Sequence, residues 1–191
     1  MSERGFRGLR LTNFHHGPGE AILQNFVLPV LANSQSYDRL TGYFNIPGLV
    51  GIASGLEALF RNSGTMRLVI GLHDVPGDLL ASLAVGDILP EEVIQAYRDR
   101  LIRDIGFLKS ETEKSSLVAV AWLIRLGYLQ VVVAAPRTTA GIFHQKRMIF
   151  RDVNGDVIAS TGSLNETQGG MGNSEEMYFQ FSWQTVESAW K

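Results

Sequence analysis

The chain of 191 residues is long enough for one domain with a sizeable core. Its formal net charge of -2 excludes a globally basic nucleic-acid-binding protein, and the lack of cysteine excludes disulfides, thiolate nucleophiles and cysteine zinc sites. The most apolar stretch, Leu117 to Ala135, is interrupted by Arg125. We therefore expect a buried helix and strand there, no membrane span, and a soluble cytoplasmic protein.

Hydrophobic periodicity predicts helices and strands that alternate along the chain. The predicted helices cover residues 19–33, 46–61, 90–109 and 112–126, and the predicted strands cover residues 37–44, 66–73, 128–136, 141–150, 156–162 and 175–183. The strand at 66–73 is a continuous apolar run, which is typical of a central strand buried on both faces. We expect an α/β fold in which a mixed β-sheet is flanked by helices on both faces, an α-β-α sandwich, within a single domain spanning residues 1–191.

The polar residues of one strand suggest a catalytic site. His144 and Lys146 are two residues apart, so their side chains share one face of the strand. The dipeptide Asn154-Gly155 predicts a hairpin turn that brings the chain back toward the start of that strand. We expect Ser163 and Asn165, at the end of the returning strand, to lie close to His144 and Lys146.

This set of side chains can hold and attack a tetrahedral anion. Lys146 supplies positive charge, and Ser163 and Asn165 supply hydrogen-bond donors that stabilise charge on a phosphate. His144 can attack phosphorus or transfer a proton. The sequence has no carboxylate cluster suited to a divalent ion beside these residues, so we expect chemistry without a metal or another cofactor.

The motifs resemble those of a known family. His144-x-Lys146 followed by Gly162-Ser163-x-Asn165 resembles the H-x-K and G-S-x-N signature of the phospholipase D superfamily. Residues 173–176, NSEE, resemble the N-x-x-E element of its nuclease branch, where Glu176 matches best on spacing and Glu175 is the alternative. Residues 37–72 also resemble phospholipase D-like domains attached to bacterial helicases and to restriction or defence nucleases.

The resemblance implies a mechanism and a partner. Members of the superfamily use two H-x-K motifs in each active site: one His becomes a phosphohistidine, and the other protonates the leaving oxygen. The glutamate orients the His. This chain has a single H-x-K motif, so the resemblance implies a homodimer in which His144 of each copy meets the other at the two-fold axis. It also implies that this domain can be the N-terminal part of a longer protein with a fused helicase or DNA-recognition domain.

Three arginines and one tyrosine are candidates for binding the substrate. Arg137, Arg147 and Arg151 form either a basic rim for the phosphate backbone of nucleic acid or part of a solvated strand face. Tyr43 either stacks on bases or forms the floor beneath the site.

Three functions remain as alternatives. The first is a metal-independent phosphodiesterase, an endonuclease that cleaves DNA, with RNA as a second candidate substrate, in restriction, defence or repair. The second is a lipid phosphodiesterase or phosphatidyl transferase, although the sequence has no amphipathic anchor and no membrane segment. The third is a catalytically inactive module for nucleic-acid binding and dimerisation. Nuclease assays in EDTA with His144→Ala as a control separate the first from the third, and activity on a phosphatidyl substrate would favour the second.

Overall fold

A computed structural model of the chain describes residues 5–42, 46–71, 91–92, 95, 99, 111–134, 145–164 and 174–184. The strands are β1 (Phe14–Pro18), β2 (Ser34–Thr41), β3 (Thr65–Gly71), β4 (Leu129–Ala134), β5 (Lys146–Asp152), β6 (Val157–Gly162) and β7 (Ser174–Phe181). The helical segments are η1 (Phe6–Gly8), α1 (Gly19–Ile22), η2 (Leu23–Val27), α2 (Leu28–Ala32), α3 (Ile46–Gly51), α4 (Ala53–Arg61) and α7 (Glu111–Arg125). These elements confirm the predicted α/β fold.

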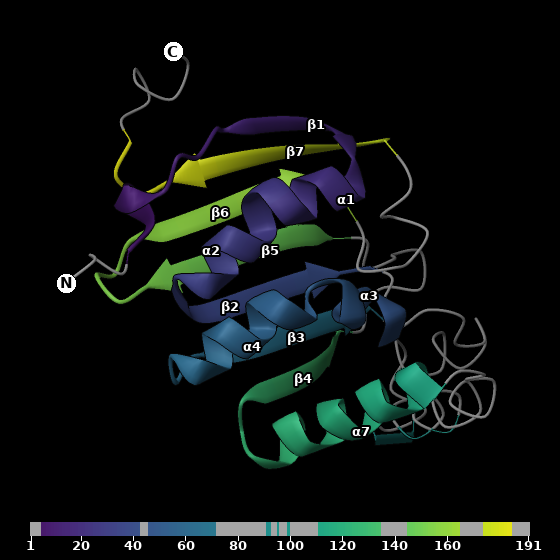
Figure 1. The fold of residues 1–191 in the computed structure, drawn as a ribbon. Coiled ribbons are helices and arrows are strands. Elements are labelled where there is room, and N and C mark those ends of the chain that lie inside the picture. The colour runs from purple at the N-terminus through teal and green to yellow at the C-terminus, as the bar shows by residue number, and fades with distance from the viewer. Residues whose placement is uncertain are drawn as a thin grey trace.

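The seven strands form one mixed sheet in the order β1-β7-β6-β5-β2-β3-β4 (Figure 1). Strands β2, β3 and β4 are parallel, and the other neighbours are antiparallel. With this topology β1, β2, β3, β4 and β6 all finish at one end of the sheet, where β5 and β7 begin. We call it the carboxyl end of the sheet, the end at which α/β proteins usually bind ligands.

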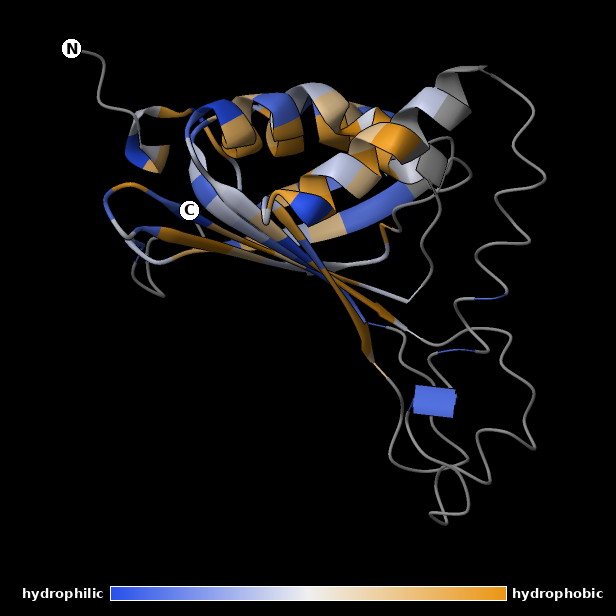
Figure 2. Ribbon diagram, turned by 90° about the horizontal axis from the view of Figure 1, so that it is seen from below, coloured by the Kyte–Doolittle hydropathy of each residue, from blue (hydrophilic) through white to orange (hydrophobic). Residues whose placement is uncertain are grey.

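The helices of the described residues pack on one face of the sheet (Figure 2). The core lies between them and the sheet, where apolar side chains of η2, α2 and α4 meet those of β3, β5 and β7. None of the helical segments from η1 to α7 covers the opposite face, and we call this the open face. The predicted helix at 90–109 lies mostly outside the described residues, so a second helical layer stays a prediction. None of the described helices is long and apolar enough to cross a bilayer.

One helical run crosses the sheet from α1 through η2 to α2, nearly as predicted for residues 19–33. Its buried side chains recur at helical spacing: Ile22, Leu23, Phe26, Val27, Val30 and Leu31. The run widens to a π-turn over η2, just before Pro29. Proline has no N–H to donate to the carbonyl four residues earlier, which explains the widening at this place.

The predicted hairpin of β5 and β6 is present, but its turn is longer than two residues. The strands stop at Asp152 and resume at Val157, and Gly155 alone in this turn has a positive φ, of 82°. The Asp152 carboxylate accepts hydrogen bonds from the backbone N–H groups of Asn154 and Asp156, both at 2.9 Å. This side-chain capping favours the wider turn over a two-residue one.

Strand β1 was not predicted from the sequence. Its five residues, FHHGP, lack the alternation of apolar and polar residues that marks a strand. It forms because the chain pairs with β7, from Phe14 opposite Tyr178 to Pro18 opposite Ser174. As an edge strand, β1 depends on this long-range pairing more than on local propensity.

Candidate active site

Lys146 begins β5 at the carboxyl end of the sheet, opposite Thr41 of β2. It shares the helix-covered face with Met148 and Phe150, both fully buried. Lys146 itself is half-buried, and this burial lowers the pKa of its ammonium group. The charge of Glu175 acts in the opposite direction and raises the pKa, whereas the charge of Arg39 lowers it.

Glu175 provides a buried carboxylate on the face of Lys146. In β7 it alternates with exposed residues and shares its face with Met177 and Phe179, and Phe179 stacks on Phe26 of η2 at 3.7 Å between ring centroids. Only 7% of Glu175 is exposed. A buried carboxylate is unfavourable unless cations lie near it, and Lys146 is one such cation.

Arg39 is a fully buried cation that sequence reasoning missed. It lies in β2 between Tyr37 and Thr41, which point to the same face, and it is opposite Met148 of β5. One terminal nitrogen of its guanidinium donates a 2.6 Å hydrogen bond to the carbonyl of Leu164. Arg39 therefore holds the Gly-Ser-x-Asn segment against β2, the strand that pairs with β5 and its Lys146. The sequence signal for this role is a charged residue at a strand position whose side chain points to the buried face.

Ser163 and Glu176 form a second group at the same end of the sheet. The backbone N–H of Ser163 donates to the carbonyl of Glu176 at 3.0 Å, and the N–H of Glu176 donates to the Ser163 hydroxyl at 3.1 Å. Both residues are exposed. Glu176 lies opposite His16 of β1, and these residues line a hollow together with Gly162 and Tyr178.

The two candidate glutamates therefore point to opposite faces of β7. Glu175 is buried on the helix-covered face with Lys146, and Glu176 is exposed on the open face with Ser163. Spacing alone cannot distinguish adjacent residues of a strand, because neighbouring side chains alternate between faces.

Gly162 explains why strands β6 and β7 approach closely beside Ser163. It lies opposite Met177, and a Cβ atom at this position would overlap the carbonyl oxygen of Glu176 and the Met177 sulfur. Any larger residue would push β7 away from Ser163. The glycine of the Gly-Ser-x-Asn segment is thus required by packing.

Two predicted substrate-binding arginines lie on the open face, opposite to Lys146. The Arg147 Nε donates to the Gln145 side chain at 3.2 Å, and its side chain is exposed. Arg151 forms a 2.9 Å ion pair with Asp38, which also pairs with Arg67 at 3.0 Å. One buried carboxylate thus offsets part of the charge of two arginines, so the positive field near Arg151 is weaker than that of two unpaired arginines.

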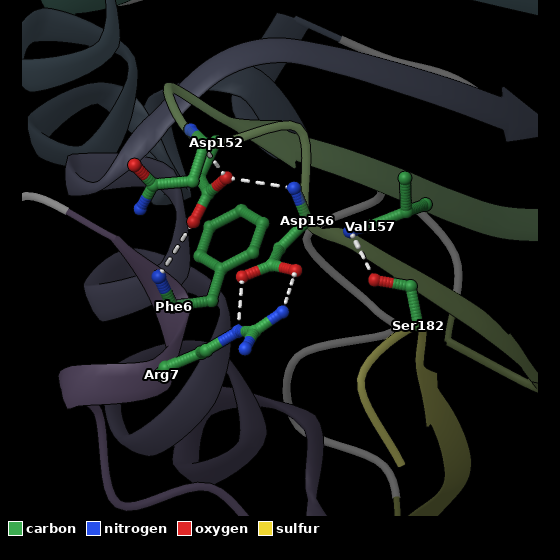
Figure 3. A network of polar contacts seen from close by, with 7 residues as sticks. Phe6, Arg7, Asp152, Asp156, Val157 and Ser182 are labelled. Atoms are coloured by element: carbon green, nitrogen blue, oxygen red, sulfur yellow. Dashed lines mark hydrogen bonds and ion pairs between the residues drawn. The ribbon is translucent and has the colours of Figure 1, made fainter. Parts of the chain in front are cut away.

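Asp152 lies at the far end of β5, away from Lys146, and has a structural role (Figure 3). Its second carboxylate oxygen accepts a 2.9 Å hydrogen bond from the backbone N–H of Phe6. Beside it, Arg7 makes a bidentate ion pair with Asp156, at 2.7 and 2.9 Å. The Arg7 guanidinium lowers the pKa of the Asp156 carboxyl. These contacts attach the N-terminal segment to the hairpin.

Several predicted site residues lie outside the described residues: His144, Asn165, Tyr43 and Arg137. Of the predicted catalytic set, the described part of the chain brings Ser163 and Glu176 together, and places Lys146 with Glu175 and Arg39. Within the described ranges, no three His, Asp or Glu side chains are arranged to hold a metal ion. Chemistry without a metal therefore stays a prediction.

No protein-family model matches the sequence, and neither does any curated protein. Among solved structures, phosphatidylserine synthase from Haemophilus influenzae Rd KW20 is 15% identical with a TM-score of 0.50, over 89% of this chain and 34% of that one. NucT from Helicobacter pylori is 12% identical with a TM-score of 0.49, over 89% and 84%. Yeast tyrosyl-DNA phosphodiesterase is 10% identical with a TM-score of 0.44, over 78% and 26%, so the chain spans about a quarter of its length.

The likeness to phosphatidylserine synthase shows a shared fold. A mixed seven-stranded sheet with helices packed on it is an α/β fold consistent with the phospholipase D-like fold. At the carboxyl end of this sheet the chain places a half-buried lysine, a buried carboxylate and a buried arginine. The lysine and the arginine lie near the buried carboxylate on the helix-covered face, and such cations can bind an anion.

Proposed function

We propose that this chain is a metal-independent phosphodiesterase of the phospholipase D superfamily that cleaves DNA. The observation that carries the proposal is the grouping of Lys146, Arg39 and Glu175 at the carboxyl end of the sheet. His144 precedes Lys146 by two residues in the sequence, which completes the H-x-K motif. Fixed positive charges at the carboxyl end of the sheet would stabilise the negative charge that builds on a phosphate in the transition state.

The proposed reaction has two displacement steps. A ring nitrogen of His144 forms a bond to phosphorus, the bond from phosphorus to the leaving oxygen breaks, and His144 of a second copy of the chain protonates that oxygen. Water then attacks the phosphohistidine, gives its proton to the second His144, and releases the first. Lys146 and Ser163, with Asn165, hold the phosphate oxygens through both steps.

We assign the orienting carboxylate to Glu175. It is buried and its charge acts on Lys146, whereas Glu176 is exposed on the other face. A buried carboxylate that accepts a hydrogen bond from imidazole fixes the ring orientation, which an exposed, mobile carboxylate does less well. Glu175→Gln is therefore expected to lower cleavage more than Glu176→Gln.

Cleavage of labelled single- and double-stranded DNA in excess EDTA tests the function. Wild-type protein cleaves in EDTA, and His144→Ala and Lys146→Met each lose about 100-fold or more in rate. Arg61→Met is the matched control, because it removes an exposed cation on α4. No cleavage of either DNA by the wild type in EDTA would reject the nuclease, and cleavage by His144→Ala at the wild-type rate would reject the mechanism.

Mixing experiments test the composite dimer site. If one site needs His144 from two copies, mixed dimers of wild type and His144→Ala are inactive. The activity of refolded mixtures is then proportional to the square of the wild-type fraction. A linear decrease would mean that each copy carries a complete site. Sedimentation of the wild type measures the dimer independently.

A phosphatidyl transferase is the second candidate, because a phosphatidylserine synthase shares the fold. The same preparation is incubated with a phosphatidyl substrate in detergent micelles. Turnover of that substrate without cleavage of DNA would replace the nuclease with this candidate.

A further inference from the structure

Two aromatic rings lie exposed on the open face at the β1 edge of the sheet. Phe14 and Tyr178 are opposite each other in the register of β1 and β7, and their ring centroids are 4.7 Å apart with a tilt of 34°. Phe14 is 46% exposed and Tyr178 is 49% exposed. Large aromatic side chains contribute most when they are buried, so an exposed pair in a regular strand is available to a flat ligand.

The ring pair adjoins the hollow that reaches Ser163. Tyr178 lines this hollow together with His16, Gly162, Ser163 and Glu176, and its volume is about 580 Å³. That volume lies in the usual range for small-molecule sites. The hollow is open to solvent and continues from the aromatic pair toward the carboxyl end of the sheet, where β7 begins.

The charge of the hollow determines which ligand it fits. The Glu176 carboxylate lines it and is exposed, so a phosphate group there would be repelled. A carboxylate accepts hydrogen bonds, as Glu and Asp do from the N4 amino group of cytosine. An uncharged, flat group with N–H donors at its edge matches both the rings and the carboxylate, and a nucleobase has these features.

We propose that Phe14, Tyr178 and the hollow beside them bind one base of a single-stranded nucleic acid whose phosphate is held at Lys146. The proposal rests on the proposed function and names the substrate as a single strand with an unstacked base. Ser163 lines the hollow on the open face, and the next residue, Leu164, accepts the hydrogen bond of Arg39, whose side chain is on the face of Lys146. The strand would therefore pass around the carboxyl end of the sheet, from the hollow on one face to Lys146 on the other. Stacking on aromatic rings accepts any base, so the site would contribute affinity without strong sequence preference.

Equilibrium binding tests the site apart from cleavage. The affinity of a fluorescent oligodeoxycytidine is measured by anisotropy in EDTA, in the inactive His144→Ala background, beside an abasic oligomer with the same number of phosphates. Tyr178→Leu and Phe14→Leu each weaken binding of the base-bearing strand by roughly tenfold, and binding of the abasic strand stays unchanged. Tyr178→Phe keeps the ring and therefore keeps the affinity.

A control variant and five distinct outcomes make the test decisive. Trp122→Leu removes another exposed ring, on α7 at the opposite edge of the sheet, and leaves both affinities unchanged. The proposal is overturned if a leucine variant loses the same affinity for the base-bearing strand and for the abasic strand. It is also overturned if Tyr178→Leu and Tyr178→Phe bind with equal affinity, or if the parent protein binds no single strand. Base-dependent binding without cleavage by wild-type protein would support this site and reject the nuclease. If Tyr178→Leu and Phe14→Leu cleave DNA at the wild-type rate and bind the base-bearing strand with unchanged affinity, this base site is rejected and the nuclease is not.

Discussion

Ser163 and Glu176 are joined by two hydrogen bonds, of which one uses the Ser163 hydroxyl as the acceptor for the Glu176 backbone N–H. The hydroxyl proton remains available for a second bond. This relationship gives Ser163 a structural role in holding β6 to β7, and leaves it one donor for a phosphate oxygen. The two roles can be separated by experiment.

Ser163→Ala is expected to lower both stability and activity. Loss of one exposed hydrogen bond lowers the free energy of unfolding by about 0.5–1.5 kcal/mol. Loss of a donor to the phosphate lowers the cleavage rate by about 100-fold. Urea denaturation and single-turnover cleavage measure the two effects.

Ser182→Ala is the matched control for that prediction. Its hydroxyl also accepts a hydrogen bond from a strand backbone, the N–H of Val157 at 2.9 Å, and lies at the far end of the sheet (Figure 3). We expect a similar loss of stability and no loss of cleavage. If both variants lose the same activity, Ser163 acts only through folding.

The pH dependence of cleavage reports on Lys146 and distinguishes the two glutamates. Burial lowers the Lys146 pKa, so its proton is lost, and activity falls, at a lower pH than for a free lysine. The Glu175 charge raises that pKa, so Glu175→Gln moves the alkaline limb of the rate profile to lower pH. Glu176→Gln leaves the limb in place. Rates between about pH 7 and 11, with circular dichroism at each pH, provide the measurement.

The lowered pKa of Lys146 also determines how this residue affects the stability of the folded chain. A lysine whose folded-state pKa is lowered destabilises the folded state at neutral pH. The penalty is relieved as pH rises from the folded toward the unfolded pKa. An alkaline limb that moves upward in Glu175→Gln would contradict the placement of this carboxylate beside Lys146.

A feature of the fold or of the candidate site could be predicted from the sequence where neighbouring residues determine it, and not where a distant part of the chain does. The β5–β6 hairpin was predictable because alternating runs flank Asn-Gly. Strand β1 was not, because only pairing with β7 stabilises it. The choice between Glu175 and Glu176 depends on the register of β7 against Gly17 and Gly162, which no local pattern encodes. Arg39 was missed because its burial depends on the carbonyl of Leu164, which is 125 residues away in the chain.

Asp38 controls the charge of the open face. Its carboxylate pairs with Arg67 and Arg151, which are each about half exposed. Asp38→Asn removes the compensating charge, so DNA binding at low salt becomes tighter and the slope of log K against log salt steepens by up to about 1. Anisotropy titrations across a salt series measure the slope.

The matched variant for this prediction is Arg151→Gln, which is expected to make the slope shallower by a similar amount. Both variants change the same ion pair, so a shared structural defect would move both slopes in one direction. An unchanged slope in both would show that nucleic acid does not contact the open face near Arg151.

Asp152 is expected to affect stability without affecting chemistry. Its carboxylate accepts three backbone hydrogen bonds, from Phe6, Asn154 and Asp156, and the residue is 5% exposed. Asp152→Ala leaves these N–H groups without an acceptor and lowers the free energy of unfolding by about 2–4 kcal/mol. Below the denaturation midpoint, the cleavage rate per folded molecule stays at the wild-type value, because Asp152 lies at the other end of β5 from Lys146. A loss of rate in fully folded Asp152→Ala protein would place this aspartate in the reaction and overturn its structural assignment.

The neighbouring pair of Arg7 and Asp156 adds a pH dependence to the same region. The Arg7 guanidinium lowers the Asp156 pKa, so the contribution of this carboxylate to stability is present above its unfolded-state pKa. That contribution is lost as pH falls through the lowered value. Asp156→Asn should therefore flatten the acid side of the stability curve, and Arg7→Gln should flatten it by the same mechanism. Urea denaturation between about pH 2 and 6 measures the curve. If Arg7→Gln leaves its acid side as steep as in the wild type, the ion pair in Figure 3 does not stabilise the folded chain in solution.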